Sequence, residues 1–286
     1  MSSDTSGGFV ILDTNALAAF EDQERLAAVR GSMRAAHLWI WPSSINALEI
    51  VRHENAHIRS RLATVLETLQ VDRPLLPPPD DLLHQTALAR LGGADGMLVD
   101  DSGFEWLTSR PENMSAEQRA EVVQTLDQWD TALDNAFTNN RQRIQQFLKQ
   151  PKLGKTWDGA EHFLEEVWLR PSQLDDLVAS EWLRLGLPNG PPSVEKVLEI
   201  GAWRLHFAGF GAALYHRVIA PEQSRKIQAV DIAQLVYLGG RSRALIVTRD
   251  MAFLKVAIAA TATYPSAVGA MSLTDFLNSS GAKAMG

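Results

Sequence analysis

The chain has 286 residues, 45% of them hydrophobic, so it can bury a substantial core as one enlarged domain or as two. It has no cysteine, which excludes disulfides, thiolate zinc sites and cysteine nucleophiles, and its net charge of −7 argues against binding nucleic acid with its whole surface. The N-terminal stretch has no signal-peptide pattern and no segment approaches the roughly 20 apolar residues of a membrane span. We therefore expect a soluble, cytoplasmic protein with no membrane partner.

The first predicted strand covers residues 9–12, and Asp13 follows it at once. Four consecutive apolar residues are typical of a strand that is buried on both faces of a parallel sheet. Ligands bind beyond the carboxyl ends of such strands, so Asp13 is a candidate ligand-binding residue. Aspartate is also a preferred helix cap, and Thr14 or Asn15 can cap the next helix too. This stretch alone leaves both roles of Asp13 open.

A second strand, residues 38–41, follows a helix predicted over residues 23–36. It ends before Ser43 and Ser44, whose hydroxyls can cap another helix. The arrangement of strand, cap and helix therefore occurs twice in the first part of the chain.

The next helix is predicted over residues 45–69, with Glu49 in its first two turns beside the end of the second strand. Residues 71–76 form a third candidate strand, which Pro74 makes short, and a helix follows over residues 82–91. This alternation of strands and helices is expected of a parallel α/β sheet.

From Gly92 to Ala220 the alternation stops and helical patterns take over, with a concentration of tryptophans. We interpret this block as a mostly α-helical insertion, either a subdomain with its own core or a lid. The predicted helices cover residues 116–149, 160–169, 174–185 and 194–218.

The α/β pattern resumes with a helix over residues 222–238 that carries Asp231. The buried strand at residues 244–248 then runs into Thr248, Arg249 and Asp250. The remaining elements are a helix over residues 253–260, an apolar run at 267–271 and a turn at 273–277.

Asp13 and Asp250 both follow buried strands, so both should emerge at the same edge of one sheet. Glu49 and Asp231 can converge on that edge if their elements are neighbours. Four carboxylates in contact raise one another's pKa values, and a divalent cation removes this penalty. Oxygen ligands without thiolates favour Mg²⁺ or Mn²⁺, and such a metal can activate water against a phosphodiester. The pattern points to hydrolysis of a nucleic-acid backbone.

The chain resembles the PIN-domain nucleases in four pieces: VILDTN with Asp13, PSSINALEI with Glu49, QAVDIAQLVYL with Asp231 and LIVTRDMAFL with Asp250. The resemblance implies a three-layer α/β/α sandwich around a parallel sheet and an Mg²⁺- or Mn²⁺-dependent ribonuclease. It further implies that all four acids hold metal, with Asp13 and Asp231 as a bridging pair. Many members are toxins of bacterial toxin–antitoxin pairs, so the expected partners are RNA and an antitoxin or other protein, with a homodimer left open.

The resemblance also implies roles for nearby polar residues. Asn15 and Thr248 would orient the carboxylates through hydrogen bonds. Ser43 or Ser44 could contact a phosphate at its helix N-terminus, or serve as a simple cap.

The resemblance leaves out the block at residues 92–220, because small PIN toxins have little chain at this point. We therefore divide the chain into a PIN-like core, residues 1–91 and 221–286, and a helical insertion, residues 92–220. The insertion could be a lid, a dimerisation surface or a protein-binding arm. A catalytically silent PIN-like module that binds RNA or protein is the main alternative function.

A different class of function is suggested by His53, Glu54 and His57, which fit the H-E-x-x-H pattern of zinc metallopeptidases. In that pattern the two histidines lie one turn apart on a helix and bind Zn²⁺. The polar Asn55 inside the motif and the absence of a clear third ligand argue against a peptidase.

Helical spacing offers another interpretation of the same residues. Glu49, His53 and His57 lie at i, i+4 and i+8, so a continuous helix would align them in one stripe with Arg52 nearby. This stripe could follow the phosphates of bound RNA, as could Arg249, or it could be a solvated face.

Overall fold

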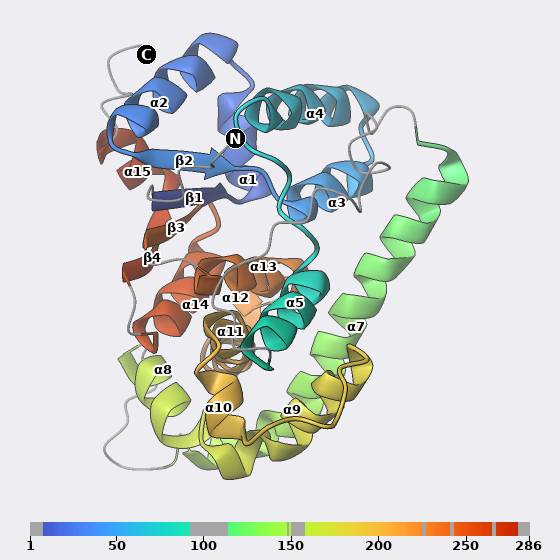
Figure 1. Cartoon of the computed structure of the whole chain (residues 1–286), viewed down its shortest axis with the longest axis vertical. Helices are drawn as coiled ribbons and strands as arrows, with labels where there is room; N and C mark the ends of the chain where they lie inside the picture. Colours follow the sequence, from blue (N-terminus) through green and yellow to red (C-terminus); the bar gives the residue numbers. More distant parts are fainter. Residues whose placement is uncertain are drawn as a thin grey trace.

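A four-stranded, fully parallel sheet forms the centre of the protein, which was analysed as a computed structural model (Figure 1). The residues that the structure describes are 8–91, 114–147, 149, 158–224, 227–240, 243–264 and 267–279. The strands are β1 (Gly8–Leu12), β2 (Leu38–Trp41), β3 (Arg243–Thr248) and β4 (Ala267–Ser272). The strands predicted at residues 9–12, 38–41 and 244–248 are confirmed, and the apolar run at 267–271 is the fourth strand. Both terminal tails and the start of the predicted insertion at Gly92 lie outside the described ranges.

The strand order is β2-β1-β3-β4, so β1 lies between β2 and β3. Val10 in β1 is paired with Ile40 on one side and with Leu245 on the other. From β1 the chain crosses to β2 at one edge of the sheet, whereas from β3 it crosses to β4 at the opposite edge. In an open parallel sheet this reversal opens a crevice at the carboxyl ends of the two central strands. Asp13, directly after β1, lies at that reversal point.

Helices cover both faces of the sheet. Three short segments connect β1 to β2: α1 (Thr14–Leu17), η1 (Ala18–Phe20) and α2 (Gln23–Ala35). The connection from β3 to β4 is α14 (Met251–Ala262), and α15 (Leu273–Ser279) follows β4. Because parallel crossovers are right-handed, connections that run in opposite directions place their helices on opposite faces. Figure 1 shows α2 on one side of the strands and α14 on the other, so the α/β layering is confirmed.

The helix predicted over residues 45–69 is wrong in one respect, because the structure contains two helices, α3 (Ser44–Arg52) and α4 (Ala56–Gln70). His53 has an extended backbone, with ψ of 128°. Asn55 then caps α4, since its side-chain oxygen accepts a hydrogen bond from the backbone N–H of His57 at 2.9 Å. Asparagine forms such a cap readily, so it starts a new helix here rather than continuing the old one.

The third predicted strand, at residues 71–76, is also wrong. Only Leu76 pairs with the sheet region, through an isolated bridge to Ser43. Pro74 has no N–H to donate to a ladder, which limits pairing in this segment. The following helix, α5 (Pro79–Leu91), begins three residues before the predicted start at residue 82.

The described part of residues 92–220 is helical, as predicted. Its elements are α7 (Ala116–Phe147), α8 (Asp158–Phe163), the π-helical turn η3 (Leu164–Trp168), α9 (Pro171–Arg184), α10 (Val194–Leu198) and α11 (Gly201–Ile219). These helices share one continuous hydrophobic core with the sheet region, and α11 packs against α14. Among the described residues, the block therefore shares its core with the sheet region. No helix within the described ranges combines the length and the apolar character that a membrane span requires.

The helix predicted over residues 222–238 is divided into α12 (Pro221–Ser224), α13 (Ala229–Ala233) and the 3-10 helix η4 (Gln234–Gly240). The break before α13 places Asp231 in the first turn of its own short helix. This division, rather than a single long helix, determines where that carboxylate lies.

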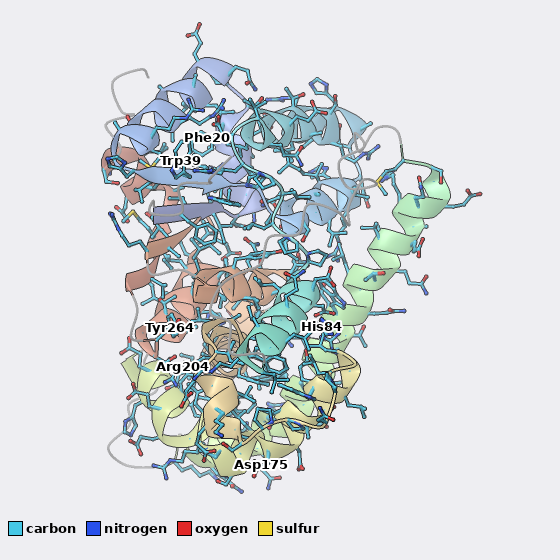
Figure 2. All side chains as sticks on the ribbon, viewed as in Figure 1. Phe20, Trp39, His84, Asp175, Arg204 and Tyr264 are labelled. Atoms are coloured by element: carbon cyan, nitrogen blue, oxygen red, sulfur yellow. The ribbon has the colours of Figure 1, made fainter. Side chains whose placement is uncertain are left out.

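Close packing joins η4 to the start of α11. A Cβ atom at Gly239 would lie 2.1 Å from the backbone nitrogen of Ala202. Tyr264 closes the same junction by donating a hydrogen bond from its hydroxyl to the Gly239 carbonyl at 3.3 Å, and Figure 2 shows Tyr264 beside Arg204 of α11. Only a residue without a side chain fits at Gly239.

We expect Gly239→Ala to destabilise the protein by about 3 kcal/mol, because backbone rather than a flexible side chain would have to move. Gly31→Ala is the matched control, since Gly31 lies within α2 with no atom in the way of an added Cβ. Alanine there should stabilise the protein by about 1 kcal/mol through helix propensity. Urea denaturation measures both changes, and a neutral Gly239→Ala would contradict the packing.

Candidate metal centre

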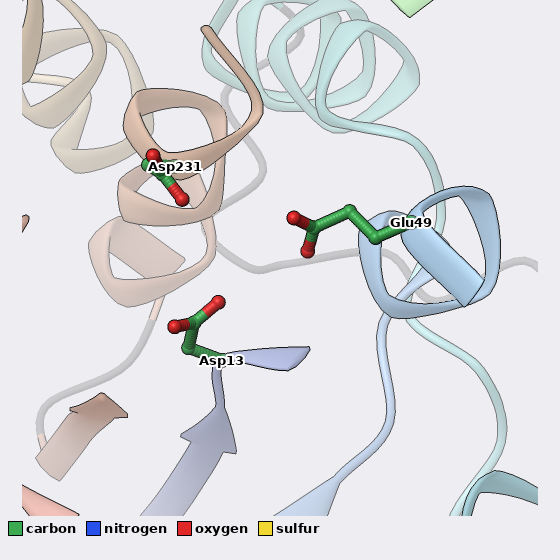
Figure 3. Close-up of side chains that lie close together, drawn as sticks. All are labelled: Asp13, Glu49 and Asp231. Carbon is green, nitrogen blue, oxygen red and sulfur yellow. The ribbon is translucent and has the colours of Figure 1, made fainter. Parts of the chain in front are cut away.

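Three carboxylates from distant parts of the sequence gather at the carboxyl end of the sheet (Figure 3). Asp13 follows β1, Glu49 belongs to α3 and Asp231 belongs to α13. One oxygen atom of each lies within 4.8 Å of the corresponding atoms of the other two. The structure thus brings together three of the four acids that the sequence singled out.

Asp13 is fully buried and is oriented from β3 and η4. Its backbone N–H donates to the Val247 carbonyl at 2.9 Å, which continues the pairing of β1 with β3. The Thr248 hydroxyl donates to Oδ2 at 2.8 Å, and the Gln234 side-chain amide donates to Oδ1 at 3.3 Å. Although Asp13 precedes α1, its side chain makes no capping hydrogen bond to that helix. The role of a simple cap is therefore excluded, and Thr248 has the orienting role predicted for it.

Glu49 is oriented by a short network that the sequence reasoning missed. The Thr14 hydroxyl donates to Oε2 of Glu49 at 2.6 Å. Asn46 in turn donates from Nδ2 to the Thr14 hydroxyl at 3.1 Å and to the Leu12 carbonyl at 2.9 Å. The spacing of Ser43 and Asn46 in the sequence could have indicated the place of Asn46, because the two residues form a reciprocal capping box at the start of α3.

Asp231 is buried, with a relative exposure of 6%. Its Oδ2 accepts a hydrogen bond from the backbone N–H of Gln228 at 2.7 Å, and the two residues form the capping box of α13. Its neighbours Val230 and Ile232 point into the hydrophobic core. Asp231 is therefore held by its own helix start and is not a solvated surface acid.

Asp250, the fourth predicted ligand, does not join this cluster. Its Oδ1 accepts hydrogen bonds from the backbone N–H groups of Ala252 at 2.7 Å and Phe253 at 3.1 Å, so it caps α14. The position after a buried strand suggested a metal ligand, but the exposed N–H groups of the next helix attract this carboxylate instead. Its charge still contributes to the raised pKa values of Asp13 and Asp231, after burial as the main cause.

The predicted contacts of Asn15, Ser43 and Ser44 are corrected by the structure. Asn15 is exposed, and Thr14 is the residue that contacts Glu49. Ser43 is buried as the cap of α3, and the Ser44 hydroxyl is buried against the Tyr237 hydroxyl at 3.1 Å. Since both serine side chains are inaccessible, neither can meet a phosphate.

The zinc-peptidase motif is contradicted by the break between α3 and α4. His53 and Glu54 lie in the break, whereas His57 lies in α4, so the histidines are not one turn apart on a continuous helix. The same break removes the predicted stripe of Glu49, His53 and His57. Arg52, which was expected beside that stripe, pairs instead with two aspartates of α7, Asp127 at 3.0 Å and Asp130 at 3.4 Å.

Burial dominates the electrostatics of the cluster. It raises the pKa of Asp13, against the hydrogen bonds from Thr248 and Gln234 that favour the ionised form. Burial and the charge of Asp13 raise the pKa of Glu49 to about 8 and that of Asp231 well above its ordinary value. Without a cation the cluster therefore retains protons near neutral pH. A set of two buried carboxylates and one partly buried carboxylate, without sulfur or histidine, fits a hard divalent cation, which would displace those protons.

We expect Thr248→Val to destabilise the protein by about 1–3 kcal/mol, because it removes one buried and one partly buried hydrogen bond at equal volume. The lost bonds are the donation to Asp13 and the acceptance from the backbone N–H of Asp250 at 2.9 Å. Thr131→Val is the control, since Thr131 is an exposed residue of α7 whose hydroxyl donates to a carbonyl of its own helix. Urea denaturation should show a change within about 0.5 kcal/mol for this control. Equal effects of the two substitutions would contradict the orienting role of Thr248.

Comparison of the chain with protein-family models, with curated proteins and with solved structures found no match in any of the three. The resemblance to PIN-domain nucleases therefore depends on the motifs of this chain alone. The function is inferred below from the carboxylate geometry at the end of β1.

Proposed function

We propose that the protein is a divalent-metal-dependent nuclease that hydrolyses RNA, with Mg²⁺ or Mn²⁺ held by Asp13, Glu49 and Asp231. The observation that carries the proposal is the convergence of these three acids, from three separate elements, within 4.8 Å at the reversal point of the sheet. Buried like charges in contact are costly, and a bound cation is the common reason for maintaining them. Such a cation, when bound, supplies Lewis-acid stabilisation of a phosphodiester and a lower pKa for the attacking water.

The surrounding residues would prepare the carboxylates for this role. Thr248 and Gln234 direct the two oxygens of Asp13, and Thr14 directs one oxygen of Glu49. Asp13 and Asp231 are buried, whereas Glu49 is partly exposed. Water and substrate would therefore approach the cluster from the side of Glu49.

A cavity near the same sheet edge carries two cationic residues, Arg249 and Lys255, which supports an anionic substrate. It has a volume of about 700 Å³ and is lined by residues that include Asn15, Arg249, Asp250 and Lys255. Arg249 is exposed and follows β3 directly. A phosphate of an RNA backbone is the kind of group that these cations would attract. The choice of RNA rather than DNA follows from the resemblance to PIN-domain nucleases.

The capping role of Asp250 favours the second candidate, a catalytically silent module that binds RNA or protein. Three carboxylates rather than four remain to bind a metal. This smaller set would suit a protein that keeps the acid cluster but does not cleave RNA. The two candidates differ in one observable, which is cleavage that depends on metal.

The test is incubation of the purified protein with single-stranded and structured RNA in Mn²⁺, in Mg²⁺ and in EDTA. We expect cleavage with either cation, none in EDTA, and loss of cleavage in Asp13→Asn. RNA that stays intact in Mn²⁺, or equal behaviour of wild type and Asp13→Asn, would refute the nuclease.

A further inference from the structure

A second cavity, of about 690 Å³, lies between one face of α7 and the junction of α11, α12 and α13. The residues that α7 contributes are spaced at helical intervals and therefore share one face. They are Asp130, Asp134, Phe137, Thr138, Arg141 and Gln145. The opposite wall includes Arg217 from the end of α11 and Gln228 from the start of α13.

Arg141 gives this cavity donors for an anion, and Arg217 lines its opposite wall. The side chain of Arg217 is only 11% exposed, and its guanidinium pairs with Asp134 and lies over the ring of Phe137 at 5.5 Å. Its Nε is buried without a hydrogen-bond partner among the described residues. Arg141 lines the cavity and is exposed. The carboxylates of the wall are already engaged, since Asp134 pairs with Arg217 and Asp130 pairs with Arg52, so the cavity does not suit a cation.

The cavity and the acid cluster share structural elements. Gln228 lines the cavity, and its backbone N–H donates to Asp231 at 2.7 Å. Asp130 also lines the cavity, and it accepts a hydrogen bond from the backbone N–H of Ala229 at 2.8 Å. The charge of Asp130 contributes to the raised pKa of Glu49, after burial and Asp13. A ligand in the cavity would therefore contact Gln228, the residue that holds Asp231 through its backbone N–H.

We propose that this cavity is a nucleotide subsite, which binds one nucleotide of a single-stranded RNA next to the phosphodiester held at the acid cluster. This inference rests on the proposed nuclease function. Arg141 pairs with backbone phosphate, as a guanidinium group does bidentately. A base stacks on the pair formed by Arg217 and Phe137. The amides of Gln145 and Gln228 offer both donors and acceptors to the base edge or to a 2′-hydroxyl.

Single-stranded RNA is favoured over a duplex because the bases of a duplex are stacked on each other and cannot enter the cavity. The subsite takes most of its lining from α7 and α11, which lie in the helical block that the PIN resemblance does not cover. The block would thus supply part of the substrate site rather than a separate arm.

The test is the affinity of the protein for a fluorescent single-stranded oligoribonucleotide in EDTA, measured by anisotropy at several salt concentrations. Arg141→Ala should weaken binding about tenfold and reduce the slope of log K against log salt by about 0.7, the value for one lost phosphate contact. Arg141→Lys should retain part of the affinity, because it keeps the charge without the bidentate fork. Lys196→Ala, at an exposed position of α10 outside the cavity, is the matched control and should bind as the wild type does.

Binding that is equal in wild type and Arg141→Ala, or equally tight for the duplex, would overturn the subsite. The cleavage assay separates this result from the nuclease proposal. If the wild type cleaves RNA in Mn²⁺ while Arg141→Ala has unchanged affinity and KM, the subsite is wrong and the nuclease stands. If the oligonucleotide binds as expected and no cleavage occurs, the nuclease is wrong and the cavity is an RNA-binding site without turnover.

Discussion

Replacing Asp13 with asparagine is expected to lower the rate of Mn²⁺-dependent RNA cleavage by about a thousandfold or more, the effect of losing several kcal/mol of transition-state stabilisation. Asp13 is the central acid of the cluster, because its charge raises the pKa of both Glu49 and Asp231. Asparagine has the same shape and can still accept the hydrogen bond from Thr248 at one atom. The loss should therefore come from the missing ligand charge and not from unfolding, which circular dichroism would verify.

Two further aspartate variants make this experiment specific. Asp176→Asn, at an exposed position of α9, should cleave as the wild type does. Asp250→Asn should reduce cleavage far less than Asp13→Asn, because asparagine is also a good helix cap and Asp250 caps α14. Equal losses in Asp13→Asn and Asp250→Asn would place Asp250 among the metal ligands, as the sequence suggested.

Without metal, the protein is expected to lose stability as the pH rises from 4.5, the ordinary pKa of Glu49, to about 8. The folded protein binds more protons than the unfolded chain in this window, because burial raises the pKa values of Asp13, Glu49 and Asp231. The free energy of unfolding then falls with increasing pH, by on the order of 1 kcal/mol per pH unit. Mn²⁺ should reverse the trend, since the cation takes the place of the protons and binds more tightly at high pH.

Thermal unfolding in EDTA and in Mn²⁺, at about pH 5 and about pH 8, measures this linkage. Asp13→Asn removes one buried acid, so its metal-free form should be more stable than the wild type at about pH 8 and should lose most of the Mn²⁺-induced increase in Tm. Asp176→Asn should keep both responses of the wild type. A metal-free stability that rises across this window would contradict the buried, proton-retaining cluster.

Much of the sheet could be predicted because its signal is local. Residues 9–12 and 244–247 are continuous apolar runs, and they lie in β1 and β3, the two central strands. A strand buried on both faces must be apolar at every position, so its sequence alone identifies it. The polar residue that follows such a strand marks the edge where ligands bind, and this singled out Asp13.

The errors arose where several local signals compete. The apolar spacing of residues 45–69 is helical throughout, yet Asn55 caps a new helix and separates α3 from α4. Asparagine is tolerated inside helices as well as favoured at their starts, so the spacing alone could not decide. That one break removes both the zinc motif and the predicted stripe of histidines.

The sequence by itself determined the parallel sheet, the edge at which its strands end and the acids that follow two of them. Only the tertiary structure decided which acids meet. Asp13 and Asp250 have the same local setting, but Asp13 makes no cap and faces α3 and α13, whereas Asp250 is bound by the N–H groups of α14. The physical reason is that a helix cap forms between residues that are neighbours in the chain, so it depends on local sequence. The convergence of the acids depends on elements more than 200 residues apart in the chain, as the hydrogen bond from Gln234 to Asp13 illustrates.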